Sequence, residues 1–138
     1  MKREIKVCGI IYKKDKQGIS ILLENDNNEW NVLFGSIENE DEIEEKTKLI
    51  AQEKSGLSDI RTISDLTRQK YWFQNGQDLV HRRVYSFLFE LPQTSTEIPS
   101  ENLKSLKWFK PEEALQVIPG QDAKLIVLKA LEKLKVTV

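Results

Sequence analysis

The sequence predicts an α/β fold in which a mixed β-sheet lies between helices. Two long stretches, 41–54 and 122–136, have the apolar spacing of amphipathic helices. Short runs rich in β-branched and aromatic residues surround them, in the order strands, helix, long hairpin, strand, helix. Because each helix must bury its apolar stripe, the two helices can cover opposite faces of one sheet, which gives three layers.

The composition is that of an ordinary globular protein. The chain has 138 residues, of which 39% are hydrophobic and 31% charged, so residues 1–138 are expected to form one domain with a single core. The formal net charge of -1 gives no overall reason to bind nucleic acid, and any such role would need a local patch. Nucleic acid is therefore not expected as a partner. The lone Cys8 and the lack of a signal peptide or membrane-spanning stretch predict a cytoplasmic protein that does not bind a membrane.

The N-terminal part of the chain predicts two paired strands. Residues 5–12 form an apolar run with Gly9 in its middle, where a bulge or a close backbone approach is expected. A turn signal at 15–18 separates this run from a second one at 19–23, so the two are expected to pair as a hairpin. A short apolar segment, 30–34, follows before the first helix.

Residues 41–54 contain neither glycine nor proline and predict the first helix. Its apolar stripe, at spacings of three and four, consists of Ile43, Thr47, Ile50 and Ala51. Carboxylates crowd its start and Lys54 lies near its end, as the helix macrodipole favours. Gly56 fits the position after the last turn, where a left-handed residue is preferred.

A long hairpin is predicted next. Asn75-Gly76 lies between an extended run at 60–73, whose first part is irregular, and a return strand at 80–91. Since side chains alternate along a strand, the return strand should present two different faces. One face carries His81, Arg83, Tyr85, Phe87 and Phe89, and the other carries Arg82, Val84, Ser86 and Leu88.

The C-terminal part predicts one more strand and two helices. Residues 92–102 are polar and are expected to form a mobile loop, followed by a short strand at 106–109. Pro111 fits the first turn of a short helix, which Pro119-Gly120 ends. The last helix has a buried stripe of Ile126, Val127, Ala130, Leu131 and Leu134.

The stretch from Gly35 to Leu57 resembles the Nudix box, G-x5-E-x7-R-E-U-x-E-E-x-G-U, in which U is an apolar residue. The positions that match are Gly35, Glu53, Gly56 and Leu57, while Ala51 fits an apolar position and Asp41 replaces the first Glu. The positions that differ are Leu49 for the Arg, Ile50 for the Glu after it and Lys54 for the last Glu. The box is therefore degenerate.

Two further segments extend the resemblance over most of the chain. Trp108 and the later Glu112-Glu113-Ala114 are similar to the W-x-x-x-E-E-A segment of Nudix (MutT-related) proteins. Tyr71-Trp72-Phe73 is similar to the Y-W-Y strand of the small bacterial dinucleoside tetraphosphate hydrolases. The resemblance implies a Nudix-like α/β/α sandwich with a mixed β-sheet between helices.

The resemblance also implies a nucleotide ligand and a metal ion. Nudix proteins cleave a nucleoside diphosphate linked to another group, and Glu residues of their box helix hold a divalent ion, usually Mg²⁺, which lowers the pKa of the attacking water. In this chain only Glu53 remains of the helix carboxylates, because Ile50 cannot ligate and Lys54 is a cation. Leu49 cannot form the ion pair of the box Arg, and Phe34 takes the position of a phosphate-contacting lysine.

The favoured hypothesis is a chain that binds a nucleoside diphosphate or polyphosphate, with pyrophosphate hydrolysis weakened or lost and no cofactor. The candidate ligand-binding residues are Lys54, Tyr71, Phe73, Arg82 and Arg83. Lys54 would replace the charge of the metal, the arginines would donate to phosphates and the aromatic side chains would stack on a base. The same aromatic side chains could instead belong to the sheet core, and the arginines to a solvated strand face.

Two other hypotheses remain open. The chain could be an active, Mg²⁺-dependent diphosphohydrolase in which Glu53 is catalytic and shares the metal with Glu45 or Glu38, although such carboxylates are also typical of a solvated surface. It could also be an RNA or protein interaction module that uses Lys70, His81 and the two neighbouring arginines. The identity of the ligand and the oligomeric state stay open.

Overall fold

The computed structural model describes residues 1–93 and 97–137, which fold around one mixed β-sheet. The strands are β1 (Lys2–Asp15), β2 (Gly18–Asp26), β3 (Glu29–Asn31), β4 (Leu33–Ile37), β5 (Arg61–Asn75), β6 (Asp78–Glu90) and β7 (Leu106–Phe109). The helices are α1 (Ile43–Ser55), α2 (Ser100–Leu103), α3 (Pro111–Val117) and α4 (Gln121–Lys133). The predicted order of elements is confirmed, with the short α2 as an addition.

β1 organises the sheet because both of its edges are paired. One edge runs parallel to β6, from Lys2 to Tyr12. The other edge pairs antiparallel with β4 over Ile5–Gly9 and then with β2 over Tyr12–Asp15. β3 and β7 pair with β2, and β5 pairs with the outer edge of β6, which gives the order β3-β2-β1-β6-β5. The sheet is therefore mixed, as predicted. On one edge of β1 the partner strand changes from β4 to β2 near the middle of β1.

Gly9 lies at this change of partner. A Cβ atom at Gly9 would lie 3.1 Å from the ring of Phe89 and 3.4 Å from Cβ of Ala51 on α1. These contacts are tighter than ordinary van der Waals packing, so the predicted close approach at Gly9 is confirmed. The absent side chain lets α1 pack directly on the middle of the sheet.

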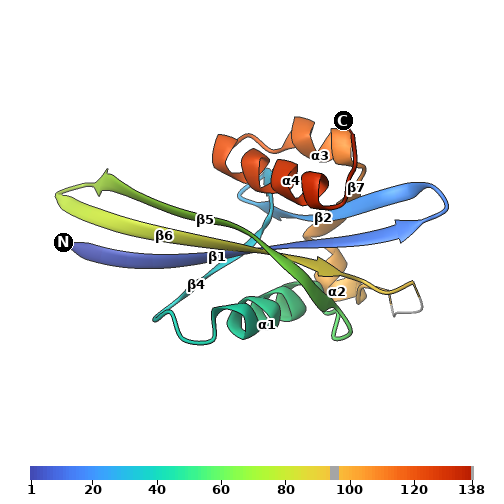
Figure 1. The fold of residues 1–138 in the computed structure, drawn as a ribbon, viewed down its shortest axis with the longest axis horizontal. Coiled ribbons are helices and arrows are strands. Elements are labelled where there is room, and N and C mark those ends of the chain that lie inside the picture. Colours follow the sequence, from blue (N-terminus) through green and yellow to red (C-terminus); the bar gives the residue numbers. More distant parts are fainter. Residues whose placement is uncertain (94–96, 138) are drawn as a thin grey trace.

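Helices cover both faces of the sheet (Figure 1). α1 lies against one face, and α3 and α4 lie against the other. One buried cluster, under α4, includes Ile10, Leu23, Val84, Leu88, Ile126 and Leu131. The other, against α1, includes Ile11, Leu22, Leu33, Ala51, Tyr85, Phe87 and Phe89. The predicted α/β/α sandwich is confirmed, and β6 divides its two sets of side chains between the two clusters as predicted.

Part of the sheet extends beyond the helices as a three-stranded arm. The arm consists of the N-terminal half of β1 and the hairpin ends of β5 and β6 (Figure 1). The hairpin turns at Gly76, whose φ of 62° is left-handed, between the paired Asn75 and Asp78. The predicted Asn-Gly hairpin is confirmed. Because helices do not cover the arm, side chains on it are available to contact other molecules.

Some element boundaries differ from the prediction for local reasons. α1 begins at Ile43 rather than residue 41, because Glu42 has a left-handed φ of 50°. The segment 30–34 is divided between β3 and β4, since β3 turns back along β2 while β4 continues along β1. Within the predicted loop 92–102, residues 100–103 form α2, and residues 94–96 lie outside the described residues. Among the described helices, none is long and apolar enough to cross a membrane.

The first prediction tests the core. Leu22 on β2 is 0% exposed, so Leu22→Ala should lower the free energy of unfolding by about 2–5 kcal/mol through the cavity that it leaves. Leu49 on α1 is 57% exposed, and Leu49→Ala is the matched control, with a change within about 0.5 kcal/mol. Chemical denaturation measures both, and equal losses would contradict the described core.

Candidate functional site

The face of α1 that would hold a metal carries an apolar side chain and a cation. Ile50 packs on β4, where a Cβ at Gly35 would lie 2.9 Å from Ile50 Cδ1. Lys54 follows one turn later and points the same way, because residues four apart share a helix face. Glu53 is exposed and Leu49 is 57% exposed, so both lie away from the contact with the sheet.

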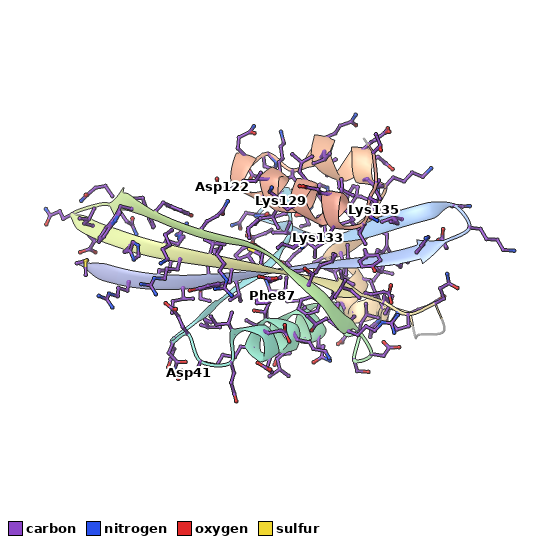
Figure 2. All side chains as sticks on the ribbon, viewed as in Figure 1. Asp41, Phe87, Asp122, Lys129, Lys133 and Lys135 are labelled. Carbon is purple, nitrogen blue, oxygen red and sulfur yellow. The ribbon has the colours of Figure 1, made fainter. Side chains whose placement is uncertain are left out.

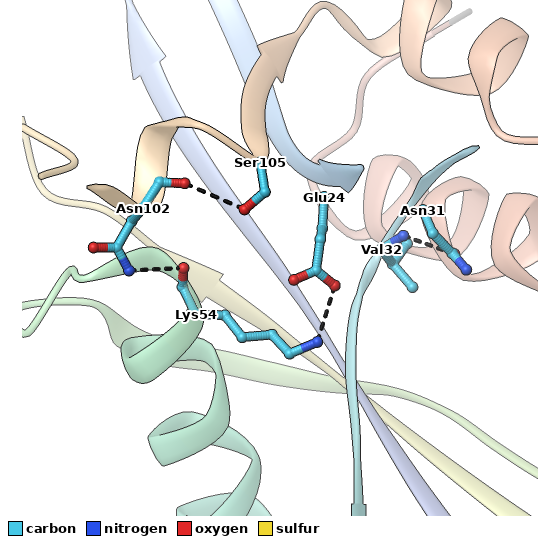
Figure 3. Close-up of polar contacts among 6 residues, drawn as sticks. All are labelled: Glu24, Asn31, Val32, Lys54, Asn102 and Ser105. Carbon is cyan, nitrogen blue, oxygen red and sulfur yellow. Dashed lines mark hydrogen bonds and ion pairs between the residues drawn. The ribbon is translucent and has the colours of Figure 1, made fainter. Parts of the chain in front are cut away.

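Lys54 forms an ion pair that joins α1 to β2 (Figure 3). Its Nζ donates to Oε1 of Glu24 over 2.9 Å, with 30% and 15% of the two side chains exposed. The Asn102 amide donates to the Lys54 carbonyl oxygen over 3.0 Å, which satisfies a backbone acceptor at the end of α1. The charge of Lys54 is therefore largely matched within the protein.

The residues at this position do not fit Mg²⁺. Magnesium takes oxygen ligands in octahedral geometry, whereas Ile50 offers none and Lys54 places an ammonium group there. The sequence-predicted ligands Glu53, Glu45 and Glu38 are exposed. Within residues 1–93 and 97–137, no group of three or more His, Cys, Asp or Glu side chains is placed to hold a metal ion.

A cavity of about 170 Å³ opens on the other face of the sheet, beneath the start of α4. The pairing of three strands builds its floor, since residues in register share a face. One row across β1, β6 and β5 is Glu4, Arg82 and Tyr71, and the next is Lys6, Val84 and Gln69. Cys8 and Phe34 continue the lining, and Gly120, Asp122, Ala123 and Ile126 of the α4 region lie over it.

Two buried polar atoms of this cavity have no hydrogen-bond partner among the described residues. They are Oε1 of Gln69, an acceptor, and Nε of Arg82, a donor. Buried polar groups are almost always paired, and an unpaired one costs about 1–3 kcal/mol. Both atoms belong to residues that line the same cavity.

The rest of the Arg82 side chain is held in place. Its Nη1 donates to Tyr71 Oη over 3.0 Å, and its Nη2 lies 3.0 Å from Glu4 Oε1. The guanidinium lies 4.3 Å from the centre of the Phe73 ring, a cation–π contact. These contacts fix the direction of the guanidinium plane, while Nε has no hydrogen-bond partner among the described residues.

Two ammonium groups contact the Phe34 ring at the edge of the cavity. Nζ of Lys6 lies 4.3 Å from the ring centre, and Nζ of Lys54 lies 4.6 Å from it. Among the described residues Lys6 has no carboxylate within ion-pair distance. Lys6 is therefore a cation that can still pair with a negatively charged ligand.

Burial raises the pKa of the nearby Cys8 thiol to about 11, although both lysines act to lower it.

The structure separates the residues that sequence reasoning grouped. Tyr71, Phe73 and Arg82 come together on the α4 face. Lys54 extends from α1 to the Phe34 ring, which Lys6 also contacts. Arg83 lies on the opposite face, because neighbouring residues of a strand point to opposite sides. There Arg83 pairs with Glu40, which also accepts a hydrogen bond from Tyr85 Oη over 2.9 Å. That hydrogen bond and then Arg83 lower the pKa of Glu40.

Sequence reasoning missed Lys6, Gln69 and the partner carboxylates Glu4 and Glu24. The alternation of β1 could have placed Lys6 beside Cys8 on one face. The position of Gln69 depends on the two register shifts of β5, between Thr62 and Ser64 and between Asp65 and Arg68, which no local pattern announces.

No family model and no curated protein matches the sequence. Solved structures, however, share its fold. A C. elegans Ap4A hydrolase superposes with a TM-score of 0.70 at 13% identity, covering 97% of this chain and 99% of that one. The Nudix hydrolase RenU from M. smegmatis gives 0.74 at 10% identity, with 98% and 88% covered.

The NUDIX domain of Shewanella oneidensis NrtR, solved with ADP ribose, gives a TM-score of 0.66 at 16% identity and covers 97% of this chain and 90% of that chain. At such identities the likeness concerns the fold. The chain has the Nudix fold, which confirms the architecture that the degenerate box implied.

The second prediction tests the environment of Cys8, the single cysteine of the chain. Since the thiol is buried and its pKa is raised to about 11, it should resist alkylation in the native protein near pH 8. Unfolding should expose one thiol that reacts at the rate of a free cysteine. Mass spectrometry measures the rate of labelling, and rapid labelling of the native protein would contradict the described burial.

Proposed function

We propose that this Nudix-fold chain binds a nucleotide-type ligand in the cavity between the sheet and α4, and that it does so without a divalent metal. The observation that carries the proposal is the pair of unpartnered atoms, Gln69 Oε1 and Arg82 Nε, in one cavity. A nucleobase presents donors and acceptors side by side on its edge and could satisfy both. The fold neighbours include an Ap4A hydrolase and a NUDIX domain solved with ADP ribose, which supports a nucleotide ligand.

The size of the cavity indicates which part of the ligand enters. Its volume of about 170 Å³ is below the roughly 300–1,000 Å³ of pockets that enclose a drug-sized molecule. We therefore place a base in the cavity and the phosphates outside it. Phe34 and Tyr71 supply apolar surface for the base, and Lys6 lines the cavity as a cation without a carboxylate partner among the described residues.

The same proposal includes weakened or absent hydrolysis. Cleavage of a pyrophosphate needs compensation of the charge that develops on its oxygens, which a divalent ion supplies in Nudix hydrolases. Here Ile50 and the Lys54–Glu24 ion pair occupy the helix face where carboxylates would hold that ion. The alternative of an active enzyme with substitute carboxylates lacks a supporting cluster among the described residues, since Glu53 and Glu45 are exposed on α1 and Glu38 is exposed in the loop before it.

The third prediction tests ligand binding. ADP ribose and diadenosine tetraphosphate, measured by isothermal titration calorimetry, should bind equally well with Mg²⁺ and with EDTA. Gln69→Leu removes the unpartnered acceptor, so it should weaken binding about tenfold while leaving the free energy of unfolding unchanged or higher. Gln116→Leu, at an exposed position of α3, is the matched control and should bind as the wild type does. Absence of binding by both ligands would overturn the proposal.

The fourth prediction tests whether Ile50 and Lys54 are the residues that prevent Mg²⁺ from binding at α1. Ile50→Glu combined with Lys54→Glu restores two carboxylates on the sheet-facing side of α1, next to Glu24. Millimolar Mg²⁺ should then raise the melting temperature of the variant, because a metal that binds only the folded state stabilises it. The wild type should show no such increase.

Leu49→Glu combined with Lys48→Glu is the control for this experiment, because it makes the same change of charge on the same helix. It should not respond to Mg²⁺. If the Ile50 substitution prevents folding, Lys54→Glu alone still brings a second carboxylate beside Glu24 and should gain a weaker response. A wild-type response as large as that of the restored variant would contradict the description of the site.

A further inference from the structure

The α1-side face of the three-stranded arm carries an exposed tryptophan. Trp72 on β5 is 54% exposed, although tryptophan is mostly buried in folded proteins. One side of its ring packs on the cross-strand neighbour His81, with 4.5 Å between ring centres and 40° between ring planes. The indole is thus held on the sheet by His81 and still presents aromatic surface to solvent.

Cations from three strands lie on the same face as this tryptophan. Lys70 lies two residues before Trp72 on β5, opposite Arg83, and Arg3 of β1 lies beside His81 in the parallel pairing. The Arg68 guanidinium lies 5.9 Å from the centre of the Tyr85 ring, which places it on the same face. The side chains of Arg3, Arg68 and Lys70 are exposed, and none of them has a carboxylate within ion-pair distance among the described residues.

Acidic side chains also lie near these cations. Glu40 is engaged by Arg83 and Tyr85, and Glu38 is exposed at the rim. Asp65 lies farther along β5, beyond Arg68 and opposite Phe87. Arg3, Arg68 and Lys70 therefore remain as exposed cations without an ion-pair partner among the described residues, although the whole chain has a net charge of -1.

A hollow of about 580 Å³ opens beside His81, the ring neighbour of Trp72, and both cations (Arg3 and Arg83) and carboxylates (Glu4, Glu38 and Glu40) line it. It lies where the arm meets the loop before α1. Between Arg68 and Trp72 the strand runs about 13 Å, so the cations extend along the strand rather than surround one point. A ligand that follows this face must therefore be extended and must carry repeated negative charges.

We propose that this face, defined by Arg3, Arg68, Lys70, Trp72 and His81, binds single-stranded nucleic acid. An exposed aromatic ring offers a stacking surface to any base, and a line of cations follows a phosphate backbone. A duplex does not fit the same chemistry, because its bases are stacked internally and cannot reach Trp72. This site differs from the cavity under α4, on the opposite face of the sheet, and the inference does not depend on the proposed nucleotide binding.

The test uses fluorescence anisotropy of labelled 15-nucleotide oligo(dT) and oligo(U) with the full chain at low salt. Trp72→Ala should weaken binding by about 5- to 150-fold, and Trp72→Phe should keep most of it because the stacking ring remains. Arg68→Ala with Lys70→Ala should reduce the slope of log K against log salt by about 1.4, which is about 0.7 per lost phosphate contact.

Lys129→Ala with Lys133→Ala is the control for charge. Both lysines lie on α4, in the layer on the other side of the sheet (Figure 2), and this variant should bind as the wild type does. Gln69→Leu should also leave oligonucleotide binding unchanged, which separates this inference from the proposed function. The absence of single-strand binding, equal affinity for a 15-base-pair duplex, full competition by inorganic triphosphate, or an unchanged affinity of Trp72→Ala would overturn the proposal.

Discussion

The double pairing of β1 is the constraint on which the rest of the structure depends. Its parallel pairing with β6 continues for eleven register positions, while its other edge passes from β4 to β2 near Gly9. The parallel register sets Lys6 beside Val84 and Arg3 beside His81, on opposite faces. A shift by one residue would reverse both faces, so the cavity under α4 and the basic face of the arm are fixed by the same ladder.

The Nudix fold is kept here with different chemistry on its first helix. Gly35 still lets α1 approach β4 closely, but the side chain that uses this space is Ile50. The ion pair between Lys54 and Glu24 then fastens the end of α1 to β2 by charge attraction within the chain. In this arrangement, the positive charge beside Glu24 belongs to the chain itself.

The fold was predictable because its signals are local or periodic. The Asn75-Gly76 turn, the alternation along β6 and the apolar stripe of α4 each follow from spacing alone. The site was less predictable, because it depends on register between distant strands. Arg82 and Arg83 are adjacent in sequence and lie on opposite faces, whereas Gln69 and Lys6 are far apart in sequence and lie in one row with Val84 between them. Only the bulges of β5 and the parallel pairing of β1 with β6 determine that row.

The most direct test of the account is a crystal structure of the protein with ADP ribose in the presence of Mg²⁺. The adenine should lie in the cavity under α4, within hydrogen-bond distance of Gln69 Oε1 and Arg82 Nε, with Lys54 still paired to Glu24 and no metal ion at α1. A magnesium ion bound to Glu53 or its neighbours on α1, with the nucleotide outside the cavity, would contradict it.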